Sequence, residues 1–207
     1  MYDLLDRDYA GTDLRGNSIK KLAKRFSVDS QQSDRVLEVA DYFLSQLSHK
    51  LAPALQSKVH QELAWAVELH EIGFIVSHND YHKHGAYLLD HVDAIGFSMD
   101  ELHRIGLLVL GHKGKLKKMS ESLAHQDFVK QLLAMRLAVL ICHGRQDHSV
   151  AEVKDFSIRI LRSEIEPKIC ITASKNWALE FPQSAYLLQE EGQAWEKVGY
   201  QFLIEWQ

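Results

Sequence analysis

The chain is organised around residues 63–89, LAWAVELHEIGFIVSHNDYHKHGAYLL. This stretch opens with an apolar run at helical spacing, which delivers the adjacent pair His70 and Glu71 at its end. Gly73 is typical of a helix stop, and three more histidines precede the next apolar run: His78, His82 and His84. A buried helix that ends in a His-acid pair, followed by a His-rich loop, is how helical metal-dependent phosphohydrolases present their ligands.

The same histidines also have a simpler interpretation. The chain contains 12 histidines, so some clustering arises by chance. A single histidine at a helix end is commonly a cap or a partner of the helix dipole. The histidines are therefore compatible with a phosphate or metal site and with a purely structural role.

The composition is that of an ordinary globular protein. The 207 residues suffice for one large or two small domains, with 46% apolar and 25% charged residues. The net charge of −4 argues against a general nucleic-acid-binding chain but allows a local basic patch. The two cysteines, Cys142 and Cys170, form no disulfide or metal pattern. Without a membrane-length apolar run or a signal peptide, we expect a cytoplasmic protein with no membrane contact.

The first two thirds of the chain read as helices. Asn17 or Ser18 is expected to cap a first helix, and Pro53 is expected in a loop. Capping boxes are predicted at Asp29 with Gln32 and at Ser98 with Glu101. The further predicted helices cover about 30–47, 59–69, 84–92, 99–110 and 126–143.

The pattern changes after Gly144. The polar residues 144–154 suggest a boundary, and residues 156–161 and 168–173 alternate as strands do. A turn at 174–176 before a strand at 177–181, a helix at 183–198 and a last strand at 200–206 complete the prediction. We therefore expect a mainly α protein with a lead-in segment at 1–16, a helical domain at 17–148 and a small α+β domain at 149–207.

Two basic segments are candidate phosphate-binding surfaces. The segment GHKGKLKK, residues 111–118, holds a histidine and four lysines, and a second group near the N-terminus includes Arg15 and Lys20. Lysine, arginine and protonated histidine satisfy phosphate oxygens, although both groups could equally be solvated surfaces. Aromatic residues are not interleaved with the lysines, so nucleic acid is not an expected partner.

Six segments in order carry a resemblance to a known family: DLRGNSIKKLAKRFSVD (13–29), LHEIG (69–73), HNDYHKHGAYLL (78–89), LGHK (110–113), RLAVL (136–140) and NWALEFP (176–182). Over nearly its whole length the chain resembles the C-terminal half of the exopolyphosphatase and guanosine-pentaphosphate phosphohydrolase family. The resemblance implies a His-Asp (HD)-like helical domain followed by a small α+β domain. In that family the catalytic half is actin-like, with Gly-rich phosphate loops that this sequence does not contain.

The resemblance also implies a role. It makes the chain a polyphosphate-binding, regulatory and dimerising portion that is inactive alone and works with an actin-like half in cis or as a separate chain. The alternative is a free-standing HD-type phosphohydrolase acting on a phosphorylated nucleotide such as guanosine pentaphosphate, and a third reading is a dimerisation module. The sequence leaves polyphosphate and guanosine pentaphosphate both open as ligands, because both present phosphate oxygens.

The resemblance finally implies a set of site residues. The HD metal ligands would fall at Gln32, at the pair His70 and Glu71, at His112 and at Val139. Glutamine and valine are poor or impossible ligands, so no cofactor is expected, and His70 and Glu71 are the remaining candidates for a divalent metal. No catalytic residue is predicted. The predicted anion-binding residues are Arg15, His78, His82, His84, His112, Lys113, Lys115 and Lys117.

Overall fold

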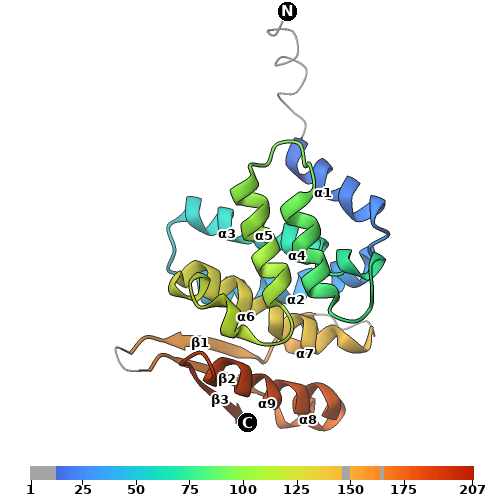
Figure 1. The fold of residues 1–207 in the computed structure, drawn as a ribbon. Helices are drawn as coiled ribbons and strands as arrows, with labels where there is room; N and C mark the ends of the chain where they lie inside the picture. Colours follow the sequence, from blue (N-terminus) through green and yellow to red (C-terminus); the bar gives the residue numbers. More distant parts are fainter. Residues whose placement is uncertain (1–12, 146–149, 164–165) are drawn as a thin grey trace, which may run out of the picture.

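The structure, a computed structural model, describes residues 13–145, 150–163 and 166–207. A helical bundle occupies one end, and a three-stranded sheet with two helices lies beneath it (Figure 1). The predicted fold class, mainly α with a small α+β part, is confirmed. The predicted domain boundary between residues 148 and 149, and most of the lead-in at 1–16, lie outside the described ranges.

The bundle consists of α1 (Leu14–Arg25), α2 (Ser30–Ser48), α3 (Pro53–Glu68), η1 (Ile72–Ile75), α4 (Tyr81–His91), α5 (Met99–Gly111), η2 (Leu116–Met119), η3 (Ser122–Ala124), α6 (Gln126–Ile141), η4 (Cys142–Gly144) and the short α7 (Val150–Val153). The predicted capping box of Ser98 and Glu101 is confirmed. At α2 only half of the predicted box forms, because the Asp29 side chain accepts from the Gln32 amide while the Gln32 side chain turns inward.

Three predicted helix starts are wrong. Helix α4 begins at Tyr81, earlier than the predicted start at His84. Helix α1 begins at Leu14, earlier than predicted, because the Asp13 side chain accepts from the Gly16 amide and caps it. Helix α3 begins at Pro53, which was expected in a loop. Proline suits the first position of a helix, where its missing N–H has no partner to lose.

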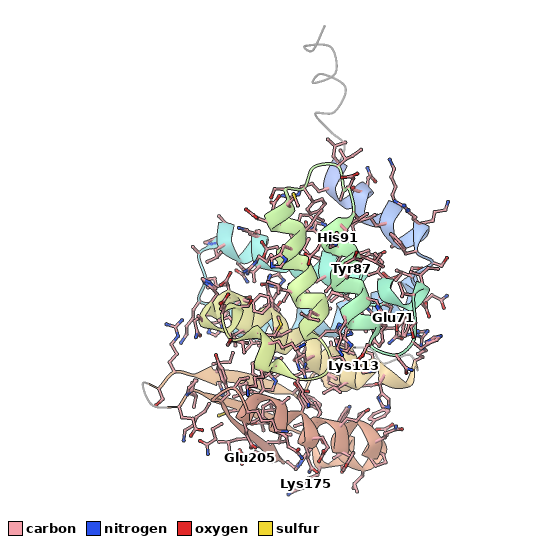
Figure 2. All side chains as sticks on the ribbon, in the orientation of Figure 1. Glu71, Tyr87, His91, Lys113, Lys175 and Glu205 are labelled. Carbon is pink, nitrogen blue, oxygen red and sulfur yellow. The ribbon has the colours of Figure 1, made fainter. Side chains whose placement is uncertain are left out.

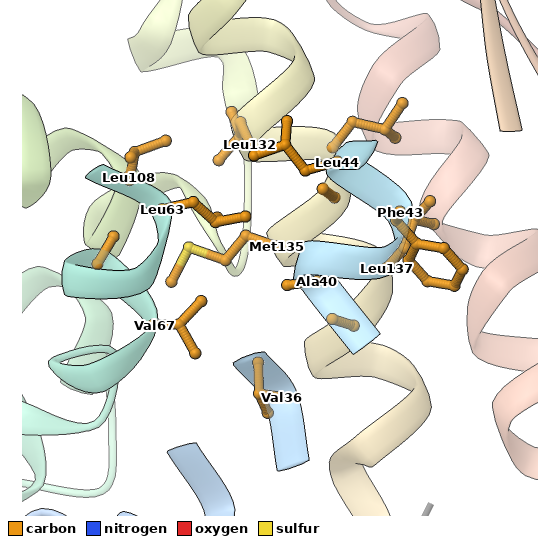
Figure 3. Close-up of a cluster of buried hydrophobic side chains, with 14 of the residues drawn as sticks. Val36, Ala40, Phe43, Leu44, Leu63, Val67, Leu108, Leu132, Met135 and Leu137 are labelled. Atoms are coloured by element: carbon orange, nitrogen blue, oxygen red, sulfur yellow. The ribbon is translucent and has the colours of Figure 1, made fainter. Parts of the chain in front are cut away.

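The core of the bundle is built around α6. This helix buries residues on nearly every side, and α2 and α3 pack on it through aliphatic and aromatic side chains (Figure 3). Leu132 and Met135 of α6 lie among Leu44 of α2 and Leu63 of α3, and all four are fully buried. Close packing of this kind makes the inward ends of α3, α5 and α6 rigid supports for polar side chains.

The C-terminal unit consists of β1 (Ser157–Leu161), β2 (Lys168–Ala173), α8 (Lys175–Glu180), α9 (Pro182–Glu196) and β3 (Gln201–Trp206). The sheet has the order β1-β2-β3, with Ser157 opposite Thr172 in the antiparallel pair and Lys168 opposite Gln201 in the parallel pair. The predicted turn and strand at 174–181 are wrong. Ser174 caps α8, which with α9 forms the helical crossover that parallel strands require.

The sheet is fixed to the bundle by polar and aromatic contacts. The Tyr42 hydroxyl donates to the Lys154 carbonyl over 2.8 Å, and the Ile158 amide donates to the Gln46 side chain over 2.9 Å. The ring of Phe43 lies 5.9 Å from that of Phe156. Helix α9 packs beside α6. No helix within the described ranges is both long and apolar enough to cross a membrane.

Candidate functional site

A cavity of about 480 Å³ opens where the ends of α3, α5 and α6 meet α4 and α9. All the positions that the resemblance identified as HD ligands line it: Gln32, His70, Glu71, His112 and Val139. Figure 2 shows Glu71 and Lys113, two of its lining residues, on the part of the bundle nearer to the C-terminal unit. We call it the histidine cavity.

Two buried histidines form its floor. The Nδ1 atoms of His70 and His112 each lie 2.6 Å from a backbone carbonyl oxygen three residues earlier, and the two rings are 5.5 Å apart. A carbonyl oxygen only accepts, so each Nδ1 carries the hydrogen and each Nε2 is an acceptor in the neutral ring. Burial lowers the pKa of His70 to about 4 and that of His112 well below its usual value. Both rings are therefore neutral at pH 7.

One wall of the cavity is aromatic. The Tyr81 hydroxyl lies 3.2 Å from Nε2 of His112, and burial raises the pKa of Tyr81 to about 12, so the hydroxyl stays protonated and donates. Phe74 stacks on Tyr81 with 4.1 Å between ring centroids, and His78 lies 4.8 Å from Phe74. This wall offers flat apolar surface rather than hydrogen-bond donors.

The carboxylate of the His-acid pair is already occupied. Arg145 donates to both Glu71 oxygens, at 3.0 and 3.2 Å, and also to Asp29 at 2.6 Å. Burial raises the pKa of Glu71, and the neighbouring Arg145 opposes that rise. One cation thus serves two carboxylates, and this arginine contributes no net positive charge to the cavity. Nothing in the local sequence around Arg145 indicated this role.

A second arginine, Arg136 of α6, joins three parts of the molecule. The residue is only 3% exposed, and its side chain binds both oxygens of Glu191 on α9, with 2.8 Å between Nη2 and Oε2. It also donates to the carbonyls of Gly111 and Gly114, and Glu191 accepts from Trp195 over 2.7 Å. Arg136 therefore holds the 111–118 loop against α9. The signal in the sequence was a charged residue within the apolar RLAVL run.

The residues present do not fit an HD metal centre. The Gln32 side chain donates to the Cys142 carbonyl over 2.9 Å and accepts from Arg35, Glu71 is held by Arg145, and Val139 has no donor atom. Among residues that the structure describes, no group of three His, Cys, Asp or Glu side chains is arranged to hold a metal ion. No catalytic step through a metal follows from this arrangement.

The basic loop divides at Gly114, where φ is +80°. On one side Lys113 reaches the histidine cavity, with Nζ 4.9 Å from the Tyr81 ring centroid. On the other side Lys115 and Lys117 line a second cavity of about 520 Å³ with Lys197, which follows α9. We call this second cavity the lysine groove. Within the described ranges none of these four lysines has an ion-pair partner.

The other predicted site residues lie apart from the histidine cavity lining. His82 is 9% exposed on α4 behind Gly114, and its buried Nδ1 finds no hydrogen-bond partner among the described residues. His84 is half-buried on the same helix. Arg15 lines neither cavity: it pairs with Glu101 at 2.6 Å and lies 4.5 Å from the ring centroids of both Trp65 and Phe97. Its guanidinium therefore joins α1 to the bundle instead of facing a ligand site.

Comparisons with known proteins place this architecture in a family. Residues 14–196 match the family model described as Ppx/GppA phosphatase, domain III, so the chain belongs to the Ppx/GppA phosphatase family and corresponds to that domain. The predicted family is confirmed.

Among its relatives is the guanosine-5′-triphosphate,3′-diphosphate pyrophosphatase of Photobacterium profundum, 29% identical over 93% of this chain and 37% of that protein. The proteins of the same name from Pseudoalteromonas translucida and Vibrio cholerae are 28% and 26% identical over 99% of the chain. The chain spans about 40% of the length of these two relatives.

Proposed function

We propose that this chain binds the phosphates of a polyphosphate or guanosine pentaphosphate ligand through Lys113, Lys115, Lys117 and Lys197. It would serve as the binding and regulatory portion of a phosphatase of its family, together with an actin-like catalytic half in cis or as a separate chain. One observation carries this proposal. Three of the lysines belong to the 111–118 loop, Lys197 lines the lysine groove together with two of them, and none of the four has an ion-pair partner in the described ranges. A phosphate chain offers only acceptor oxygens and would supply the missing counter-charge.

The electrostatics of the lysine groove favour an anion. Its one lining carboxylate, Glu190, accepts from Gln193 over 3.1 Å, so three lysines face one acidic residue. Each lysine that neutralises a phosphate releases a condensed counterion, as in nucleic-acid binding. Affinity should therefore fall steeply as salt concentration rises.

A charge-removal series tests this proposal. Replacing Lys113, Lys115 and Lys117 by Ala should weaken long-chain polyphosphate binding about ten- to a hundredfold at about 0.1 M salt, as three surface charge pairs of roughly 0.5–1 kcal/mol predict. The matched control replaces the exposed Lys20, Lys21 and Lys24 of α1 by Ala, with the same charge change, and should keep the affinity. Wild-type affinity in the loop variant would show that the loop is only a solvated surface.

We further infer that the chain alone does not release phosphate from polyphosphate. The Gly-rich phosphate loops of the actin-like half are not in this sequence. A phosphate-release assay against a full-length relative tests this. Release at a comparable rate, lost in His70→Ala, would favour the alternative of a free-standing HD-type phosphohydrolase.

The expected metal content follows from the side chains of the histidine cavity, because potential ligand atoms are already bound to other protein groups. Because Gln32 and Glu71 are held by protein groups and Val139 has no donor, we expect no stoichiometric transition metal in the purified protein. Elemental analysis after dialysis checks this expectation. A retained metal at about one ion per chain, as a structural or catalytic site would hold, contradicts it.

We also propose that the chain forms a homodimer. In the described part of the sheet, β1 and β3 each pair only with β2, and Leu161 on β1 and Leu203 on β3 are 51% and 43% exposed. Open strand edges with exposed apolar side chains favour pairing with a second copy. Light scattering should give twice the chain mass of 23.8 kDa, and a mass of 23.8 kDa at micromolar concentration would contradict the proposal.

A further inference from the structure

Two cavities of different chemistry adjoin at Gly114, which lines both. The histidine cavity carries an apolar and aromatic lining that includes Phe74, Tyr81, Val139, Leu140 and Leu187. Its two arginines are already bound to Glu71, Asp29 and Glu191, and its one lysine, Lys113, adjoins Gly114. The lysine groove is lined by three lysines that lack ion-pair partners in the described ranges. A ligand that suits both must be uncharged at one end and anionic at the other.

The hydrogen-bond polarity of the histidine cavity narrows the ligand further. The Nδ1 of His70 donates to the Val67 carbonyl, so its Nε2 accepts, and no described residue donates to that atom. The Tyr81 hydroxyl is directed to His112. A bare phosphate chain presents only acceptor oxygens, which cannot bond to an acceptor nitrogen. The floor of the cavity therefore matches a ligand group that carries an N–H or O–H.

We propose that the histidine cavity holds the nucleoside part of a phosphorylated nucleoside, with an N–H or O–H of the ligand donating to Nε2 of His70, while its phosphates extend past Gly114 onto the lysine groove. This proposal rests on the proposed function and narrows its ligand from any phosphate chain to a nucleotide. The cavity volume of about 480 Å³ falls in the usual range for small-ligand sites. Gly114 itself carries no side chain where it lines the two cavities, and the ring of His82 lies behind it.

Calorimetry on the intact chain with two probes of equal phosphate length tests the proposal. Guanosine 5′-triphosphate should bind about tenfold more tightly than tripolyphosphate at matched ionic strength, because only the nucleotide fills the histidine cavity. His70→Leu should lower the nucleotide affinity by about tenfold while tripolyphosphate affinity stays within about twofold, since the lost acceptor serves only the nucleoside. Phe74→Ala, at a partly exposed position, should have the same selective effect and serves if the His70 variant fails to fold.

The outcomes separate this inference from the proposed function. Equal affinity for both probes, or equal weakening of both by His70→Leu and Phe74→Ala, would overturn the nucleoside assignment and leave phosphate binding by the lysines intact. Replacing Lys115, Lys117 and Lys197 by Ala should weaken both probes alike. Binding of neither probe by the wild-type chain would overturn the proposed function and this inference together.

Discussion

The histidine cavity and the lysine groove share Gly114, but their arginines and lysines are paired differently. Within the described ranges, both arginines that line the cavity are bound to carboxylates, whereas Lys113 beside Gly114 and the lysines of the groove have no such partner. A buried charge must be paired because its desolvation is costly, while an exposed lysine stays hydrated at little cost. In this domain the buried Arg136 is paired and supports the fold, the half-exposed Arg145 is paired as well, and the exposed lysines around Gly114 are available to a ligand.

The cavity brings together the positions that the resemblance gives as HD metal ligands, but two of them, Gln32 and Val139, are poor or impossible ligands. His70 and His112 keep the orientation that backbone carbonyls impose on metal-binding histidines. Val139 gives this part of the wall an apolar surface, and Gln32 is turned toward the Cys142 carbonyl. The proposed nucleoside binding would use this apolar surface and the acceptor nitrogen of His70.

The largest expected loss of stability comes from breaking the buried ion pair of Arg136 and Glu191 beside the histidine cavity. Arg136→Ala should lower the free energy of unfolding by about 3–5 kcal/mol, because it leaves Glu191 charged and buried and releases the Gly111 and Gly114 carbonyls. Urea denaturation at neutral pH measures this change in the free energy of unfolding. The double variant Arg136→Met with Glu191→Leu removes both charges and should cost less. A loss below about 1 kcal/mol in the single variant would show that this pair is not structural.

A smaller loss of stability is expected when the pH is lowered, because of His70 in the histidine cavity. The pKa of folded His70 is about 4 against 6.5 for the free side chain, so as pH falls the unfolded chain takes up a proton first and is favoured. His70 alone should reduce stability by about 2 kcal/mol between about pH 7 and pH 5, and the loss ends near its folded pKa. Urea midpoints at the two pH values measure this. His70→Gln should show a clearly smaller loss, and an equal loss would contradict the argument.

The smallest stability effect is expected on the groove side. Replacing the groove lysines Lys115, Lys117 and Lys197 by Ala should change the free energy of unfolding by no more than about 0.5 kcal/mol, because exposed side chains without ion-pair partners contribute little to stability. Urea denaturation under the same conditions as for Arg136→Ala gives the direct comparison. If the triple variant lost more than about 1 kcal/mol, the lysines would have a structural role and the contrast between the two regions would fail.

Local patterns predicted much of the fold and part of the site. The capping box of Ser98 and Glu101 and the strand alternation around Ile158 are local signals, and both gave the observed elements. The resemblance led to His70 and His112, which lie just after α3 and α5 and meet because those helices end at the same cavity.

The partners of those residues could not be predicted from spacing. Arg145 meets Glu71 across 74 positions, and Arg136 meets Glu191 across 55. Such pairs depend on how helices pack, which no local pattern encodes. The segment 174–181 misled because its apolar residues suit either a strand or a short helix, and the parallel pairing of β2 with β3 decided the outcome.

The salt dependence of polyphosphate binding is the sharpest test of whether phosphates bind to the lysines around Gly114. Affinities of the wild type and of the variant with Lys113, Lys115 and Lys117 replaced by Ala would be measured from about 0.05 to 0.2 M salt. Each lost lysine contact removes about 0.7 from the slope of log affinity against log salt, so we expect a slope shallower by about 2 in the variant. An unchanged slope would contradict phosphate binding at this loop, because the phosphates would then be neutralised elsewhere on the molecule.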